Sequence, residues 1–148
     1  MTKPEITGRR DYEARYSRDH RDKLPHYCLM TDIDSIEYRI INGEPRPVAI
    51  VELKGLTKHG VKEFFKTSQY RLEKYIASVL KIPFFIVYRD EDKSFIVIDV
   101  FKKESFKVSE KDYWDGIASI YMDDEGRIIY NFKNKINIKV IGFMEVEE

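Results

Sequence analysis

The sequence predicts an α/β fold, a single domain in which a mixed central β-sheet is flanked by helices. Its 148 residues suit one hydrophobic core. Helix-like and strand-like patterns alternate along the chain. The 43% hydrophobic content, with only 7 Gly and 5 Pro, excludes a disordered chain. We therefore expect one domain over 1–148, with a helix over 8–23, a core over 27–101, and a helix and strands over 109–147.

The first elements are predicted from charge, breaks and β-branched residues. Residues 8–23 are charged and contain no proline, which favours a short helix, and Pro25 marks its end. Residues 27–41 are rich in aromatic and β-branched side chains, which is typical of a strand. Asn-Gly at 42–43 is a strong turn signal, and the apolar run beginning at Val48 predicts a second strand.

A change of period predicts a long helix over 56–81. Apolar or small side chains there recur at intervals of three and four residues: Val61, Phe65, Ser68, Leu72, Ile76 and Val79. Pro83 ends this pattern. We expect that face to be the one packed on the sheet.

The last third of the chain predicts a hairpin, a helix and two more strands. The apolar runs 84–88 and 95–101 flank a charged turn, which indicates a hairpin. Residues 109–121 predict a helix, because Ser109 and Asp112 resemble a capping pair. Residues 127–132 and 136–146 are again typical of strands.

Composition and charge exclude several classes of protein. The 26 basic and 26 acidic residues cancel, so no global positive field indicates nucleic acid. Cys28 is the one cysteine, which excludes an intrachain disulfide and a zinc site with several thiolates. The sequence contains no Gly-rich phosphate loop, so we expect no nucleotide cofactor. No long apolar stretch occurs and residues 1–10 are polar, so we expect a soluble, cytoplasmic protein without membrane contact.

Acidic residues occupy two strands where apolar side chains are expected. Asp32 and Asp34 share one face of the first strand, and Glu52 and Lys54 share one face of the second. A hairpin between the strands puts Asp34 opposite residues 51–55. Carboxylates at that distance repel one another, so they either hold a proton or bind a cation. Oxygen ligands suit Mg²⁺, or Mn²⁺ in its place.

Several segments together resemble the restriction-endonuclease-like PD-(D/E)xK nuclease superfamily. They are T-D-I-D-S-I-E-Y, a short hairpin, V-A-I-V-E-L-K, a helix containing S-Q-Y, and P-F-F-I-V-Y. The resemblance covers about residues 28–88. It implies a restriction-endonuclease-like core and a Mg²⁺-dependent DNA endonuclease, with DNA as the partner.

The resemblance also implies roles for particular residues. Asp34 and Glu52 would bind the metal, and Lys54 would position the attacking water and stabilise developing charge. Asp32 is an alternative or additional ligand, because the two-residue spacing leaves the choice open. Leu53, between Glu52 and Lys54, is counted with the metal site. No proline precedes either aspartate, which departs from the motif.

Two further residues match positions that related nucleases use. Gln69 follows E-x-K on the predicted helix, where a polar residue can lie near the metal or the phosphate. Glu13 has the spacing of an additional acid on the first helix. A second E-x-K, at 91–93, falls in a predicted turn and shows that the spacing alone is not specific.

DNA contacts have to be local because the net charge is zero. We favour a basic cluster that directly follows Lys54, at the start of the long helix: Lys58, His59, Lys62 and Lys66. A second cluster of arginines lies within 9–23. Cleavage of a duplex or a junction needs two active sites, which favours a homodimer.

Other functional readings stay open at this point. The same fold without catalysis could bind nucleic acid or protein. A general α/β interaction domain could carry these charges on a solvated strand face, held by weak cross-strand ion pairs.

Overall fold

The structure, a computed structural model, describes residues 15, 18–19, 21–30, 33–54 and 58–139, without the side chains of 58–60. The chain divides into two compact units, residues 1–32 and 33–148. In the described part of the chain, no helix is long and apolar enough to cross a membrane.

The first unit contains helix where the sequence predicts it. The described residues of 8–23 are helical: Arg15, Arg18, Asp19 and Arg21 to Lys23. The helix ends before Pro25, whose carbonyl accepts a hydrogen bond from Cys28 N at 2.9 Å. The predicted strand over 27–41 is wrong at its start, because residues 27–30 are not a strand.

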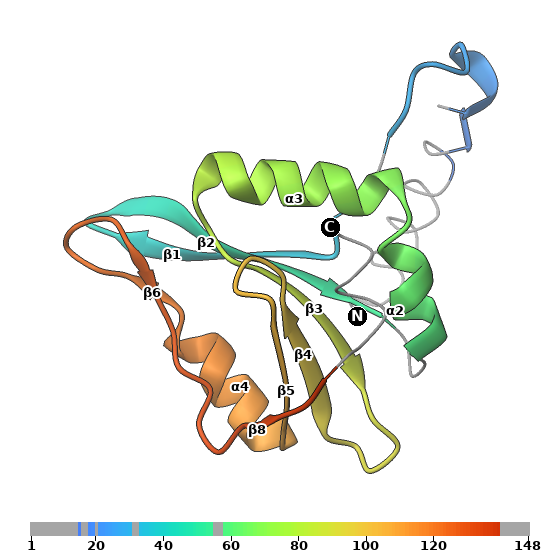
Figure 1. The fold of residues 1–148 in the computed structure, drawn as a ribbon. Coiled ribbons are helices and arrows are strands. Elements are labelled where there is room, and N and C mark those ends of the chain that lie inside the picture. The colour runs from blue at the N-terminus through green and yellow to red at the C-terminus, as the bar shows by residue number, and fades with distance from the viewer. Residues whose placement is uncertain (1–14, 16–17, 20, 31–32, 55–57, 140–148) are drawn as a thin grey trace, which may run out of the picture. The chain divides into compact units, whose positions relative to one another are not determined.

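The second unit is built on a six-stranded mixed sheet (Figure 1). Its strands, in spatial order, are β1 (Ser35–Ile41), β2 (Glu44–Leu53), β3 (Phe84–Arg89), β4 (Phe95–Asp99), β5 (Glu104–Val108) and β8 (Ile136–Asn137). The pair β2 and β3 is parallel, and the other neighbouring pairs are antiparallel. Beside it lies a two-stranded sheet, β6 (Tyr121–Met122) with β7 (Ile128–Ile129). The predicted mixed α/β class is confirmed.

Apolar side chains pack on both faces of the six-stranded sheet. One cluster joins Ile50, Ile86 and Ile98 to residues of α2 (Lys58–Phe64) and α3 (Ser68–Leu80). The other joins sheet residues such as Phe85 to α4 (Glu110–Ser119). The buried, continuously apolar strands β3 and β4 are expected for a sheet covered on both faces.

The β1–β2 hairpin has an irregularity that changes its register. Asn42 and Gly43 form a two-residue turn with φ of 54° and 80°, the left-handed pair of a type I′ turn. Ile41 pairs with Glu44, but nearer the other end Ser35 pairs with Val51. One residue of β2, Val48, is therefore unpaired as a β-bulge between the Tyr38 and Glu37 pairs.

The long helix predicted over 56–81 is wrong in continuity. Its predicted buried face is partly right, because Val61 and Phe65 are buried and Ile76 packs on the core. Thr67 lies between the two helices and is the N-cap of α3. Its hydroxyl donates to Phe64 O, at the end of α2, at 2.7 Å and accepts from Tyr70 N at 3.1 Å. A capping threonine competes with the helical backbone, which explains the break. The buried residues of α3 are Tyr70, Glu73 and Ala77. Leu72 and Val79, predicted to be inside, are 44% and 62% exposed.

The later elements agree in part with the sequence. Helix α4 is confirmed, and Ser109 Oγ caps it by accepting from Asp112 N at 3.1 Å. Strand β5 was not predicted, although Phe106 and Val108 alternate with polar residues. The strands predicted over 127–132 and 136–146 are shorter, at β7 and β8, and residues 140–146 lie outside the described residues.

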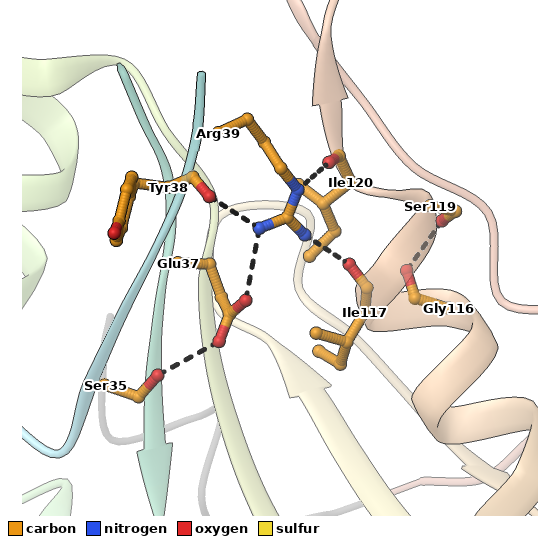
Figure 2. A network of polar contacts seen from close by, with 8 residues as sticks. All are labelled: Ser35, Glu37, Tyr38, Arg39, Gly116, Ile117, Ser119 and Ile120. Atoms are coloured by element: carbon orange, nitrogen blue, oxygen red, sulfur yellow. Dashed lines mark hydrogen bonds and ion pairs between the residues drawn. The ribbon is translucent and has the colours of Figure 1, made fainter. Parts of the chain in front are cut away.

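An arginine ties the edge strand β1 to helix α4 (Figure 2). Arg39 donates from Nε to Ile120 O at 3.0 Å and from Nη2 to Ile117 O at 2.8 Å. Glu37 holds the same guanidinium at 3.3 Å. Ile117 O also accepts from Ile120 N at 3.2 Å, so the arginine adds a charged donor to carbonyls at the C-terminal end of the helix, where a cation is favourable.

We expect Arg39→Ala to lower the free energy of unfolding by about 2 kcal/mol, because a hydrogen bond to a charged group contributes about 1.5–3 kcal/mol and water can replace part of this partly buried set. Denaturant unfolding followed by circular dichroism measures the change. The control is Arg46→Ala on β2, an exposed arginine that donates to Pro45 O at 3.4 Å. Its effect should stay within about 0.5 kcal/mol, and equal losses in both variants would contradict a specific role for Arg39.

Candidate metal and active site

The hairpin register brings Asp34 and Glu52 to the same face of the sheet. The pairing ends at Ser35 with Val51, and the same register continued by one residue places Asp34 opposite Glu52, whose pKa responds to the charge of Asp34. Directly opposite residues of an antiparallel pair point to the same face, with Cβ atoms about 5 Å apart. Asp34 Oδ2 also accepts a hydrogen bond from Leu53 N at 2.9 Å. The predicted position of Asp34 opposite residues 51–55 is confirmed.

Helix α3 places an amide and a second glutamate over Glu52. Gln69 Nε2 donates to Glu52 Oε1 at 3.3 Å and to Glu73 Oε2 at 3.0 Å. Gln69 and Glu73 are four residues apart, so they lie on one side of the helix. Gln69, selected from the sequence, therefore lies beside Glu52 and bridges the two glutamates.

Glu52 and Glu73 are buried without enough hydrogen-bond donors. Both are 0% exposed. Glu52 Oε2 and Glu73 Oε1 accept no hydrogen bond from any donor that the structure describes. A buried, ionised carboxylate without partners is costly, so each oxygen requires a proton or a cation.

The pKa values of both glutamates follow from this environment. Burial raises the pKa of Glu52 to about 8, and the negative charges of Glu73 and Asp34 add to the effect, while Lys54 opposes it. Burial likewise raises the pKa of Glu73, opposed by hydrogen bonds from Gln69 and from the Glu52 carboxyl and by the charge of Lys54. In the absence of a cation, Glu52 therefore carries a proton at neutral pH.

Lys54 supplies the positive charge of the cluster. It follows β2 directly, and its backbone N donates to Val87 O at 2.8 Å, which extends the pairing with β3 by one residue. Its ammonium lies 3.8 Å from the centroid of the Phe64 ring on α2. This cation–π contact holds the ammonium in place near the acids, where its charge lowers the pKa of both glutamates.

The oxygen atoms of Asp34 and Glu52 are ligands that suit a hard divalent ion. One oxygen of each side chain is already hydrogen-bonded within the protein. In the described part of the chain, no three His, Cys, Asp or Glu side chains are arranged to hold one ion. Mg²⁺ needs only one or two protein carboxylates, because water and substrate oxygens complete its shell. Asp34, which is exposed, and the unpartnered Oε2 of Glu52 match that requirement.

Several residues selected from the sequence are not brought to this cluster or cannot be placed. Asp32 and Glu13 lie outside the described residues, as do the side chains of Lys58 and His59. Leu53 is 52% exposed, and its amide donates to Asp34. The remaining two members of the basic cluster are both exposed: Lys62, and Lys66, which pairs with Glu63 at 3.3 Å.

Sequence reasoning missed Glu73. Its signal was present, because Tyr70, Glu73 and Ala77 have helical spacing and form the buried face of α3. A carboxylate on such a face indicates a buried polar site. The predicted inner face contained Leu72, Ile76 and Val79, so Glu73 was expected to face solvent.

A comparison with family models, curated proteins and solved structures finds no match for this chain. The case for a function therefore depends on the geometry of the site.

We expect the metal-free protein to lose stability as pH rises from about 5 to 8. The folded pKa of Glu52 is raised from 4.5 to about 8, so the folded state keeps a proton in this range that the unfolded chain has lost. Folding is therefore favoured at the lower pH. Glu52→Gln should flatten this dependence, measured by denaturant unfolding at a series of pH values in EDTA.

The control for this experiment is Glu91→Gln, a change in the exposed turn between β3 and β4. It should leave the slope of stability against pH unchanged. Glu52→Gln with the full slope of the unaltered protein would show that Glu52 is not the titrating group.

Proposed function

We propose that the protein is a divalent-metal-dependent endonuclease of the restriction-endonuclease-like superfamily that hydrolyses DNA phosphodiester bonds. The observation that carries this proposal is the juxtaposition of Asp34 and Glu52 across the hairpin, with Glu52 buried and one of its oxygens unpartnered. Lys54 stands two residues from Glu52, as E-x-K requires. Nuclease chemistry gives these unfavourable features a purpose, because a bound cation would remove their cost.

Asp34 and Glu52 would hold Mg²⁺ or Mn²⁺, with Asp32 as the further acid named by the resemblance. The bound ion would polarise a phosphoryl oxygen and lower the pKa of water. Lys54 would stabilise the negative charge that develops at phosphorus, from a position fixed by the Phe64 ring.

Gln69 would position the metal ligand rather than contact the metal. Its amide holds Glu52 Oε1, which leaves Oε2 as the oxygen of Glu52 that accepts no hydrogen bond. The same amide holds Glu73, so helix α3 and strand β2 are joined through one side chain. The basic cluster Lys58, His59, Lys62 and Lys66 would bind the DNA backbone, and the homodimer stays a prediction.

We expect Asp34→Asn, Glu52→Gln and Lys54→Ala each to slow cleavage at least about a hundredfold, or about 3 kcal/mol of transition-state stabilisation. The assay incubates each protein with Mg²⁺ or Mn²⁺ and a panel of duplex, branched and single-stranded DNA. Glu91→Gln, in the second E-x-K, is the matched control and should cleave normally. Unchanged turnover in Glu52→Gln would refute the assignment.

The alternative is a catalytically inactive member of the same fold, and metal binding separates the two readings. Mg²⁺ or Mn²⁺ should raise the melting temperature of the unaltered protein, because the ion binds the folded state and not the unfolded chain. Asp34→Asn should abolish the increase. A protein that is stabilised by metal but cuts no DNA in the panel would favour the inactive reading. No stabilisation would argue against a metal site.

A further inference from the structure

A groove runs along the side of α3 that faces the end of β4. It consists of two adjoining hollows, of about 620 Å³ and about 480 Å³, which share Ser78 and Phe101. The first extends from Lys66, between α2 and α3, and the second ends at Arg127 and Tyr130 beside β7. We call the two hollows together the α3 groove.

The charged side chains of the α3 groove are almost all basic. They are Lys66, Arg71, Lys74, Lys81, Lys102 and Arg127. Lys66 pairs with Glu63, and Arg127 pairs with Asp123 and Glu125. Arg71, Lys81 and Lys102 form no ion pair with any residue that the structure describes, so the charges of these three remain available to a ligand. The groove therefore offers a row of cations in a protein whose net charge is zero.

Among the described residues, the one acidic side chain that lines the groove, Asp99, is buried and hydrogen-bonded to its neighbours. Asp99 is 2% exposed, and it accepts hydrogen bonds from the Tyr130 hydroxyl and from Lys102 N. It therefore does not offer a free negative face to a ligand. The ammonium of Lys102 lies 4.4 Å from the centroid of the Tyr130 ring, which orients a cation over the second hollow.

Aromatic rings are exposed between these cations. Tyr75 is 67% exposed and Phe101 is 41% exposed, and both line the first hollow. Two exposed rings that line the same recess together offer an apolar surface to a ligand. Alternating cations and open ring faces are the features with which proteins bind a single nucleic-acid strand: the cations hold phosphates and the rings stack on bases.

We propose that the α3 groove binds a single-stranded segment of nucleic acid. In a duplex the bases are stacked on one another and could not reach Tyr75 and Phe101, whereas an unpaired strand can present both its bases and its phosphates. An acidic peptide would use the cations but leave the rings without a role.

One end of the groove lies at the junction of α2 and α3, and α2 also carries Phe64 of the proposed nuclease site. The substrate class inferred from this position rests on the proposed function. Lys66 lies between α2 and α3, two residues from Phe64, whose ring carries the ammonium of Lys54. On the proposed function, a strand leaving the groove at the α2–α3 junction would continue toward Lys54. The substrate class is therefore DNA with an unpaired segment next to the bond that is cut.

Binding is tested without metal, so that the result does not depend on catalysis. The full-length protein in EDTA is titrated into a fluorescein-labelled oligothymidine of about 15 nucleotides, and anisotropy gives the Kd. Tyr75→Ala should weaken binding at least about fivefold, the lower range for loss of one base stack. The matched control is Tyr38→Ala on β1, a tyrosine that is 59% exposed and does not line the groove.

Salt dependence tests the cations. Arg71→Ala combined with Lys102→Ala should reduce the slope of log affinity against log salt by about 0.7 for each phosphate that the protein no longer neutralises. The control is Lys111→Ala on α4, which packs on the opposite face of the sheet. Melting curves of all variants confirm folding, and Phe101→Ala provides a second aromatic variant should Tyr75→Ala be unstable.

The outcomes are distinguishable from those of the nuclease proposal. The groove proposal is overturned if oligothymidine does not bind, if Tyr75→Ala and Phe101→Ala bind normally, or if a duplex or polyglutamate binds as tightly as the single strand. Binding that depends on Tyr75, without cleavage of any DNA in Mg²⁺, would leave the groove in place and refute the nuclease. Cleavage that the groove variants do not change would support the nuclease and refute a role of the groove in holding its substrate.

Discussion

The β-bulge at Val48 determines which face of the sheet Asp34 occupies. The turn alone sets a register in which Asp34 would lie opposite Val51, on the face covered by α4. The extra residue shifts the pairing by one, and a one-residue shift moves every side chain of the strand segment to the other face. Asp34 then lies opposite Glu52 and beneath α3 rather than α4. The candidate site exists because of this single irregularity.

The cluster is stable only because the rest of the fold constrains it. Strand β2 is hydrogen-bonded on both sides, to β1 and to β3, so Glu52 cannot turn toward solvent without breaking the sheet. Thr67 starts α3 at a point that sets Gln69 and Glu73 over Glu52. Arg39 fixes the opposite side of β1 to α4. Burial of two carboxylates is therefore imposed by packing on both faces, and the stability of the core offsets its cost.

Helix α3 carries different chemical groups on two of its sides. The buried side carries Glu73 to the acidic cluster, and the neighbouring side carries Arg71, Lys74 and Tyr75 to the groove. One helix thus separates a region that attracts a cation from a region that attracts an anion. The proposed hydrolysis of nucleic acid would need both, because the scissile phosphate would have to reach the metal while the rest of the strand is held elsewhere.

Local periodicity and turn chemistry were enough to predict the α/β class, the Asn-Gly turn, the capping of α4 and the approximate position of Asp34 opposite residues 51–55. The exact register, which depends on the bulge at Val48, was not contained in the turn. Gln69 was found through a resemblance. The tertiary structure alone decided that Thr67 breaks the long helix, that Glu73 rather than Leu72 points inward, and that cations and aromatic rings line one groove. These features depend on which face of α3 meets the sheet, and that choice is made by packing between residues distant in sequence, which periodicity does not contain.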